Sequence, residues 1–558
     1  MRYIMLLLAL SCQSALAAAP FNQQQLAEFA RHSSLQFAVL AKQPEQPMQF
    51  NAAITLHNGS AHALPKGAAD WQIYFHLIRH LDTTELQGLK IEHVQGDLHR
   101  ISPTANFAGL PKAQQLTLNF SSAPWMVSYS DFMPRAFITA STLQPEVFRN
   151  TDTEDFSQFV QPLLQPEQLL RNFAEPDLVA IVTPSGRHTH NAALLPADLN
   201  VDVSTQVIPT PQHAELTQHQ VALTADWQLQ FADGLQTEAR YLQQQLLQQG
   251  ITLKMAEGNV QPNSKRISLS TNPALPLSAE GYQLDISDKL ISLSGKDQAG
   301  AFYAAQTLLA LLHSAANQLS LPAGQITDQP RASWRGMHYD MARNFHGKDV
   351  TLRLIDNMAR YKLNKLHLHL TEDEGWRLQI PGLPELTDIG AKRCFDLTEQ
   401  QCLLTQLGTG PHAAGSGNGY YSTEDFIQIL RYATERHIEV IPEIDLPGHA
   451  RAAIVAMKAR YNKLMAQGKP EQAAKYLLSD PNDNSTYLSV QNYNDNSANV
   501  CLASTYTFIE KVLTELQAMY RQAGVRFTTF HMGGDEVAKG SWLGSAACQQ
   551  LFNQSGND

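Results

Sequence analysis

The sequence predicts a chain of three parts: an N-terminal β-sandwich, a small α/β domain and the first half of a (β/α)8 TIM barrel. Three observations lead to this fold class. Short, partly alternating apolar runs continue to about residue 175, helical and strand patterns mix between about 207 and 330, and strands alternate with helices from 333 onward. Such alternation is typical of parallel βα units. With 558 residues, the chain is long enough for three domains.

The first part, residues 20–183, is predicted to be a β-sandwich. Trp71, Tyr74 and Phe75 could form a sugar-stacking face, but aromatic residues at this spacing are more often core, and we expect core. A proline-containing stretch over about 184–211 predicts a linker. The strand candidates are residues 35–40, 50–58, 70–80 and 113–120.

The second part, residues 207–330, shows no evident catalytic cluster. We expect helices over 235–250 and 298–314, and strands over 266–270, 281–287 and 289–295, the last two forming a hairpin.

The third part, residues 333–558, carries the βα pattern. Ser422 is a candidate N-cap, with Asp425 where a capping box more often has Glu. Strands are expected over 336–342, 365–370, 438–445 and 527–534, with helices over 348–361, 422–436 and 503–523.

The first 20 residues, MRYIMLLLALSCQSALAAAP, predict a secretory signal peptide over 1–17, cleaved after Ala17. Cys12 raises the alternative of a lipoprotein, although Leu10-Ser11 before it fits a lipid-attachment box poorly. No later stretch approaches the roughly 20 apolar residues of a membrane span. We therefore expect an exported protein that is periplasmic, associated with the outer membrane or secreted.

Four further cysteines can pair in three ways in an oxidising compartment. We favour Cys394–Cys402, whose short loop closes easily, together with Cys501–Cys548. The alternative is four free buried thiols. A net charge of −11 and a pI of about 6.0 argue against nucleic acid or an anionic membrane as the main partner.

Polar residues follow all four predicted barrel strands, where the active site of such a barrel lies. They are Arg343 after the first strand, Glu372 and Asp373 after the second, Asp445 and His449 after the third, and Asp535 and Glu536 after the fourth. A single acidic pair in a loop is usually exposed to solvent and has no function. Polar, chemically active residues at four successive strand ends, however, indicate one site.

The last of these groups lies in the motif HMGGDEV, residues 531–537. Adjacent residues in an extended chain point in opposite directions, so Asp535 and Glu536 are expected to contact different atoms of one ligand. Gly533 and Gly534 would let the backbone approach that ligand or adopt dihedrals that other residues avoid.

A metal site is the alternative interpretation. His367 and His369 lie on one face of a strand, and His449, Asp535 and His531 could complete a ligand set. We favour hydrogen-bonded histidines that line the barrel, because they precede the strand end and TEDEGWR follows them directly. No metal or organic cofactor is expected.

Four segments together resemble the family 20 glycoside hydrolases, the β-N-acetylhexosaminidases, and especially bacterial chitobiases. They are RASWRGMHYDMARNFHGKD, YKLNKLHLHLTEDEGWR, IEVIPEIDLPGHARAA and HMGGDEV, and the likeness extends to both N-terminal parts. The resemblance implies removal of terminal N-acetylhexosamine from chitobiose and chitin oligosaccharides, with the substrate's 2-acetamido oxygen as nucleophile.

The same resemblance implies residue roles. Glu536 matches the general acid, and Asp535 matches the residue that holds the acetamido N–H. Arg343 matches the arginine that binds sugar hydroxyls, and His449 matches a histidine that supports the acidic network. Glu372 stands where the family usually has an aspartate before Asp373. For both residues the alternative is a purely structural acid that does not contact the substrate.

Only four of eight barrel strands are expected, so we predict a truncated barrel and little or no hydrolysis by this chain alone. A non-catalytic protein that binds chitin oligosaccharides through its N-terminal domains is the alternative function, and a metal-dependent amidohydrolase is a third. We expect a monomer. Preference between N-acetylglucosamine and N-acetylgalactosamine stays open.

Overall fold

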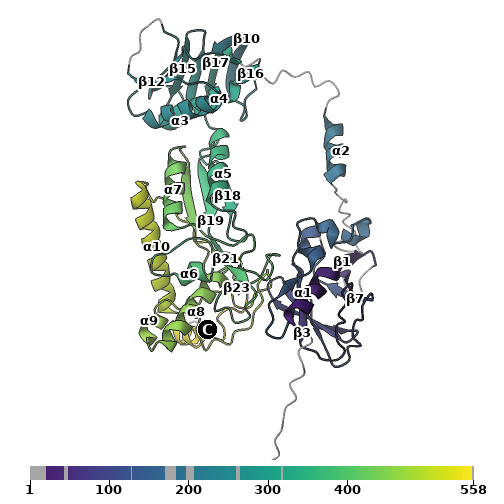
Figure 1. The fold of residues 1–558 in the computed structure, drawn as a ribbon. Coiled ribbons are helices and arrows are strands. Elements are labelled where there is room, and N and C mark those ends of the chain that lie inside the picture. Colours follow the sequence, from purple (N-terminus) through teal and green to yellow (C-terminus); the bar gives the residue numbers. More distant parts are fainter. Residues whose placement is uncertain are drawn as a thin grey trace, which may run out of the picture. The chain divides into compact units, whose positions relative to one another are not determined.

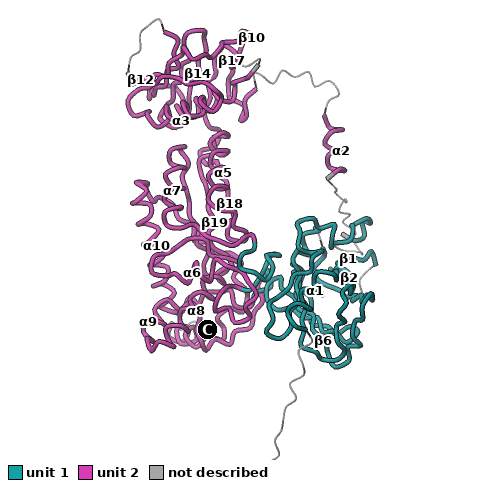
Figure 2. The backbone as a smooth tube through the Cα atoms, in the orientation of Figure 1, with its two compact units in different colours: residues 1–182, 404–415, 490–493 teal, residues 183–403, 416–489, 494–558 magenta. Residues whose placement is uncertain are grey.

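The computed structural model describes residues 21–42, 48–126, 128–169, 184–195, 206–258, 264–315 and 318–555. The predicted signal peptide and Cys12 lie outside the described residues. The chain forms two compact units (Figure 2). Unit 1 comprises residues 1–182, 404–415 and 490–493; unit 2 comprises residues 183–403, 416–489 and 494–558.

Unit 1 contains two antiparallel sheets that contribute to one apolar core. Helix α1 (Gln23–His32), which was not predicted, begins with a capping box between Asn22 and Gln25. The three-stranded sheet is β1 (Ser34–Leu40), β2 (Phe50–His57) and β7 (Gln115–Ser122); the six-stranded sheet has the order β4 (Thr84–Leu86), β5 (Leu89–Gln95), β6 (Leu98–Pro103), β3 (Trp71–His76), β8 (Phe137–Ala140) and β9 (Glu146–Val147). Short 3-10 turns are η1 (Tyr129–Asp131), η2 (Arg149–Thr151), η3 (Phe156–Gln158) and η4 (Pro166–Leu169).

The aromatic residues of β3 belong to this core. Trp71, Tyr74 and Phe75 are fully buried, and Trp71 packs edge-on against Phe107. The core assignment is therefore confirmed, and the sugar-stacking alternative is wrong because these rings have no exposed face.

The segment predicted as a linker over 184–211 contains a helix, α2 (Pro184–Leu194; Figure 1). Its side chains from Ser185 onward are exposed. The stretch predicted as a linker therefore includes a helix that begins at Pro184, because a proline fits the first turn of a helix, where its missing N–H has no partner to lose.

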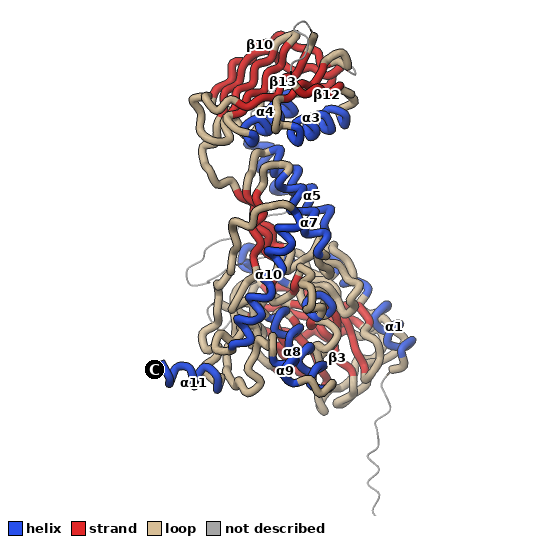
Figure 3. The backbone as a smooth tube through the Cα atoms, turned by 90° about the vertical axis from the view of Figure 1, so that its left-hand side faces the viewer, coloured by secondary structure: helices blue, strands red, loops and turns tan. Residues whose placement is uncertain are grey.

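The second part of the chain forms an eight-stranded mixed sheet with the helices α3 (Gln236–Gln248) and α4 (Gln298–Leu311) on one face (Figures 1 and 3). The expected hairpin is confirmed as antiparallel pairing of Tyr282–Ile286 with Leu290–Gly295. Four further strands, two on each side of the three predicted ones, and one short strand were not predicted. In sheet order the strands are β10 (His213–Leu223), β17 (Gln318–Asp328), β14 (Tyr282–Ile286), β15 (Leu290–Gly295), β13 (Arg266–Thr271), β11 (Gln228–Phe231) and β12 (Lys254–Glu257), with β16 (His313–Ala315) paired to β17.

The third part of the chain builds a parallel sheet in the order β18 (Gly336–Asp340), β19 (Lys365–His369) and β24 (Glu439–Glu443). The predicted N-cap and capping box of Ser422 and Asp425 are confirmed at α7. The helices are α5 (Lys348–Arg360), α6 (Glu385–Asp388), α7 (Thr423–Thr434), α8 (Arg451–Ala466), α9 (Pro470–Ala474), α10 (Ala503–Ala523) and α11 (Ala546–Ser555); short strands are β20 (Thr371–Glu372), β21 (Gly375–Trp376), β22 (Arg393–Cys394) and β23 (Leu403–Leu404).

The fourth strand, expected over 527–534, is not formed. One parallel bridge joins Glu443 to His531, and the amides of Ile444 and Leu446 donate to the carbonyls of His531 and Met532. Two features explain the difference: Gly533 and Gly534 have φ of +66° and +104°, which interrupts an extended run, and among the described residues no strand pairs with the segment's other side.

Both favoured disulfides are confirmed, Cys394–Cys402 and Cys501–Cys548. Among the described helices, none combines the length and apolar character that a membrane crossing requires.

Candidate active site

The carboxyl ends of the parallel strands bring the predicted residues together. Arg343 follows β18, Glu372 and Asp373 follow β19, and His449 follows β24. The bridge at His531 holds the segment that carries Asp535 and Glu536 beside the end of β24. Parallel strands end at the same edge of their sheet, so four separate stretches of sequence converge there.

Glu372 is the centre of this cluster. Its Oε1 lies 2.7 Å from Arg343 Nη2 and 2.8 Å from His369 Nε2, and its Oε2 lies 3.0 Å from His449 Nδ1. Burial alone would raise the pKa of Glu372, but hydrogen bonds from the two histidines and the Arg343 charge lower it to about 2. Glu372 thus contacts three cationic groups.

Asp373, the neighbouring acid, is held differently. Its Oδ1 accepts from the Arg451 backbone N–H at 3.1 Å, and its Oδ2 accepts from Asn496 Nδ2 at 2.9 Å. Burial, and then the negative charges of Glu374 and Glu372, raise the pKa of Asp373 well above its ordinary value. Asp373 therefore ties the start of α8 to the loop at Asn496.

His449 links Glu372 to the acidic pair. Its Nδ1 contacts Glu372, and its buried Nε2 lies 3.3 Å from Glu536 Oε2 and 3.9 Å from Asp535 Oδ2. Burial opposes the charged imidazole, but the hydrogen bond and charge of Glu372 outweigh it and raise the pKa of His449 to about 9. The imidazole is therefore cationic at neutral pH.

Asp535 and Glu536 lie at the open side of the cluster, with side chains 67% and 46% exposed. The premise that both lie in extended chain is wrong, because Glu536 has a φ of +51°. This left-handed turn brings both carboxylates towards the same nitrogen of His449.

Of the two glycines before the acids, Gly533 makes room for Asp445 and Gly534 binds it. A Cβ on Gly533 would lie 1.9 Å from Asp445 Oδ1, and the Gly534 amide donates to that oxygen at 2.8 Å. Burial first, with Asp535 nearby, raises the pKa of Asp445 to about 7, although the Gly534 bond opposes the rise. In this structure the glycines thus allow the Asp445 carboxylate to approach the backbone closely.

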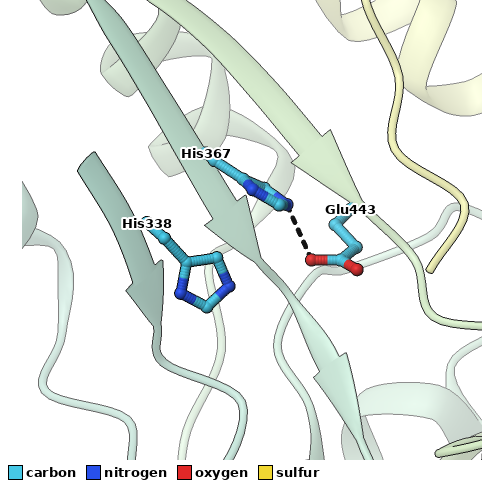
Figure 4. A group of neighbouring side chains, drawn as sticks. All are labelled: His338, His367 and Glu443. Atoms are coloured by element: carbon cyan, nitrogen blue, oxygen red, sulfur yellow. Dashed lines mark hydrogen bonds and ion pairs between the residues drawn. The ribbon is translucent and has the colours of Figure 1, made fainter. Parts of the chain in front are cut away.

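A second group of side chains lies along the sheet on the N-terminal side of this cluster. His338 of β18, His367 of β19 and Glu443 of β24 point towards one another (Figure 4), and His367 Nε2 lies 2.7 Å from Glu443 Oε2. Glu443 also contacts His369 Nδ1 at 2.5 Å and His531 Nδ1 at 2.9 Å. Three imidazoles on one buried carboxylate match the predicted hydrogen-bonded histidines.

The same residues bear on the metal alternative. His338, His367 and Glu443 each place one ligand atom within 4.8 Å of the others, as do Glu372, Asp445 and His449. Glu443, however, already accepts from His367 and His369 of β19, and its Oε1 lies 2.9 Å from His531 Nδ1.

Several residues of the site were not predicted. Asp340, at the end of β18, contacts Arg343 Nη1 at 2.6 Å, and Arg451 and Asn496 hold Asp373. Glu443 lies two residues before Asp445 on β24, and the alternation of a strand would have placed both on one face.

Three protein-family models match this chain and indicate its class of protein. Residues 333–558 match the glycosyl hydrolase family 20 catalytic domain, residues 204–329 match its domain 2, and residues 33–185 match a model described as a carbohydrate binding domain.

Among curated relatives, the chain is 42% identical over 489 residues to the N,N'-diacetylchitobiase of Vibrio harveyi, covering 85% of this chain and 52% of that protein. It is 32% identical over 526 residues to the beta-hexosaminidase of Vibrio furnissii, covering 94% of this chain and 74% of the relative. The chain belongs to glycosyl hydrolase family 20.

A solved structure agrees with this assignment. The exo beta-N-acetylglucosaminidase of Vibrio harveyi, in complex with N-acetylglucosamine, superimposes with a TM-score of 0.73 at 29% identity, covering 94% of this chain and 71% of that chain. The chain spans 52–63% of the length of the first three curated relatives.

Proposed function

We propose that the protein containing this chain hydrolyses terminal non-reducing β-linked N-acetylhexosamine, chiefly N-acetylglucosamine, from chitobiose and chitin oligosaccharides. The observation that carries the proposal is the placement of Glu536 and Asp535 at 3.3 Å and 3.9 Å from one cationic imidazole, in a family 20 catalytic domain. The named activities of the Vibrio relatives support it.

The proposed reaction uses the substrate's own acetamido oxygen as nucleophile, with retention of configuration. Glu536 protonates the leaving glycosidic oxygen and then takes a proton from the attacking water. Asp535 accepts the acetamido N–H and stabilises the positive charge of the cyclic intermediate, which fixes the attack geometry. Both side chains are exposed enough to reach a bound sugar.

The remaining predicted residues are proposed to shape the sugar site. Arg343, with a side chain 32% exposed, binds sugar hydroxyls from its position between Asp340 and Glu372. His449 supports Glu536, and Glu372 and Asp373 hold His449 and the start of α8 in place.

The wider organisation is also proposed. The βα units are the first half of a (β/α)8 barrel, preceded by a carbohydrate-binding sandwich over 20–183 and an α/β domain over 207–330. The protein is exported as a monomer to the periplasm, the outer membrane or the medium. Two disulfides support an oxidising compartment.

We expect slow turnover by this 558-residue chain alone. Electrostatic stabilisation of a charged transition state needs a site shielded from water, and 67% and 46% exposure of the two acids leaves them screened. Turnover comparable to that of the Vibrio harveyi enzyme would contradict this expectation.

Two chromogenic substrates with the same leaving group, a β-N-acetylglucosaminide and a β-glucoside, test the reaction. The chain should hydrolyse only the first, because the glucoside lacks the acetamido nucleophile. Glu536→Gln should lower the rate by about 100-fold or more. Equal hydrolysis of both substrates, or a rate unchanged in the variant, would refute the mechanism.

Binding separates hydrolase from binding protein. If hydrolysis is undetectable, N-acetylglucosamine should still shift the amide resonances of Gly533 and Gly534, and Asp535→Asn should weaken the effect. Chitin-oligosaccharide binding confined to the sandwich would favour the non-catalytic alternative. Stoichiometric zinc together with loss of activity in chelator would favour an amidohydrolase.

A further inference from the structure

Glu372 is surrounded by more positive charge than it can neutralise. Arg343, His369 and His449 each contact it at 2.7–3.0 Å. Glu372 is 1% exposed, so little water is available to spread the excess charge. A second carboxylate is therefore needed beside at least two of the three cations.

Two of the cations have such a second carboxylate. Arg343 Nη1 contacts Asp340 Oδ2 at 2.6 Å, and His369 Nδ1 contacts Glu443 Oε2 at 2.5 Å. Although burial alone would lower the pKa of His369, its hydrogen bonds to Glu372 and Glu443 raise it to about 10. Glu443 itself is 3% exposed.

His449 has the same geometry with one difference. Its Nδ1 contacts Glu372, whereas its buried Nε2 makes no hydrogen bond to any described residue and lies 3.3 Å from Glu536 Oε2. Asp373, Asp445 and Asp535 are the other acids near this imidazole. In this pattern each cation lies between Glu372 and a second acid, and for His449 the second acid is Glu536.

From this pattern we infer that Glu443 is a positioning residue for the proposed catalytic acid, acting through His369 and Glu372 on His449. The four contacts form one alternating chain of carboxylates and imidazoles: Glu443–His369–Glu372–His449–Glu536. With Glu443 and Asp340 as counter-charges, Glu372 holds His449 Nδ1, and Nε2 stays directed at Glu536.

Glu443 also contacts the segment of the chain that carries Glu536. His531 Nδ1 lies 2.9 Å from Glu443 Oε1 and 3.0 Å from the Gly533 amide nitrogen. His531 Nδ1 can either donate to the Glu443 carboxylate or accept from the Gly533 amide. In both cases His531 lies between Glu443 and the turn before Asp535. One carboxylate thus contacts both sides of the proposed site.

Glu443→Gln tests the inference, with Glu439→Gln as matched control. Glu439 lies four residues earlier on β24 and pairs with Lys365, Thr528 and Thr529, without contact to the alternating chain. In Glu443→Gln the two imidazolium groups of His369 and His449 still share Glu372, but one neighbouring negative charge is gone. The pair of imidazoles must therefore release its first proton at lower pH.

The measurement is NMR titration of the His369 and His449 rings in histidine-labelled protein, assigned with single variants. The first deprotonation of the pair should move down by about one pH unit or more in Glu443→Gln and stay unchanged in Glu439→Gln. His449 should then exchange its Nδ1 proton faster with water. Titration identical to that of the parent would overturn the inference.

Hydrolysis supplies a second readout, which rests on the proposed function. Glu443→Gln should lower kcat about tenfold, change KM less than about twofold and move the alkaline limb of the pH profile to lower pH. If Glu443→Gln does not fold, Glu443→Asp, which draws the carboxylate back from His369 Nδ1, takes its place in both measurements, with the same direction of change expected. If the parent neither hydrolyses the β-N-acetylglucosaminide nor binds N-acetylglucosamine, the proposed function fails while the titration still decides the inference.

Discussion

Two buried imidazoles carry positive charge at neutral pH, and this charge makes stability depend on pH. The pKa values of His369 and His449 are raised to about 10 and about 9 from the ordinary 6.5. Between pH 6.5 and these values the folded state binds more protons than the unfolded state. The stabilisation is complete below pH 6.5 and is lost as the pH rises through 9 and 10.

We therefore expect the melting temperature to fall between pH 7 and pH 10. Asp445, whose pKa is raised to about 7, has already lost most of its own contribution at the start of this range. His369→Gln should lower stability at pH 7 but flatten its decline above that pH. A decline of the same steepness in the variant would contradict the assignment.

Several residues of the candidate site could be predicted from the sequence, but the contacts between them could not. Asp535, Glu536, Arg343, Glu372 and His449 could be predicted because each follows a strand or lies in a distinctive motif. Which of these residues contact one another could not be predicted. The contact between Glu443 and His369, for example, depends on the parallel register of β19 and β24, which places the two residues side by side.

At the scale of elements, helix α7 shows how local sequence sets a boundary. The Ser422 side chain accepts from the Asp425 amide, and the Asp425 side chain accepts from the Ser422 amide, so both amides at the helix start are satisfied. This interaction spans only four residues and needs no tertiary contact. It was therefore predictable from sequence.

Ser422→Ala should lower the free energy of unfolding by about 1 kcal/mol, because it removes one side of the capping box. Thermal unfolding of the variant and of Glu424→Ala, which leaves both capping bonds in place, measures the effect. No greater loss in Ser422→Ala than in the control would show that the cap is not used.

The missing fourth strand belongs to the same scale. Residues 527–534 have a β-like composition, but a strand needs a partner along its length as well as propensity. Here a single bridge forms at His531, followed by two glycines with positive φ. Composition alone cannot reveal whether a pairing edge is continuous.

At the scale of the whole molecule, unit 1 gathers segments far apart in sequence. Residues 404–415 and 490–493 lie within the stretch that matches the catalytic domain, yet they belong to unit 1. The Asp97 amide donates to Gln406 Oε1 at 2.8 Å, Asp97 Oδ2 accepts from the Leu407 amide at 2.7 Å, and the Gly96 amide donates to the Asn492 carbonyl at 3.1 Å. Nothing in the local sequence signals these contacts.

Gly96→Ala should release both segments. Gly96 has a φ of +59°, and a Cβ there would lie 2.4 Å from Gln406 Oε1 and 2.7 Å from the Tyr493 ring. Limited proteolysis should cleave residues 404–415 faster in this variant. Gly67→Ala, with a φ of +77° and nothing within 4 Å, is the control for backbone strain alone. Equal cleavage in the two variants would contradict the prediction.

By itself the sequence determined the parallel βα pattern and the family, and it favoured the disulfide pairing that the structure shows, because these depend on periodicity, spacing and motifs. Only the tertiary structure decided that Glu372 contacts three cations, that Gly533 makes room for Asp445 and that Glu443 lies at the start of an alternating chain ending at Glu536. Such contacts join strands up to about a hundred residues apart, and strand register and burial set them, which no local pattern encodes.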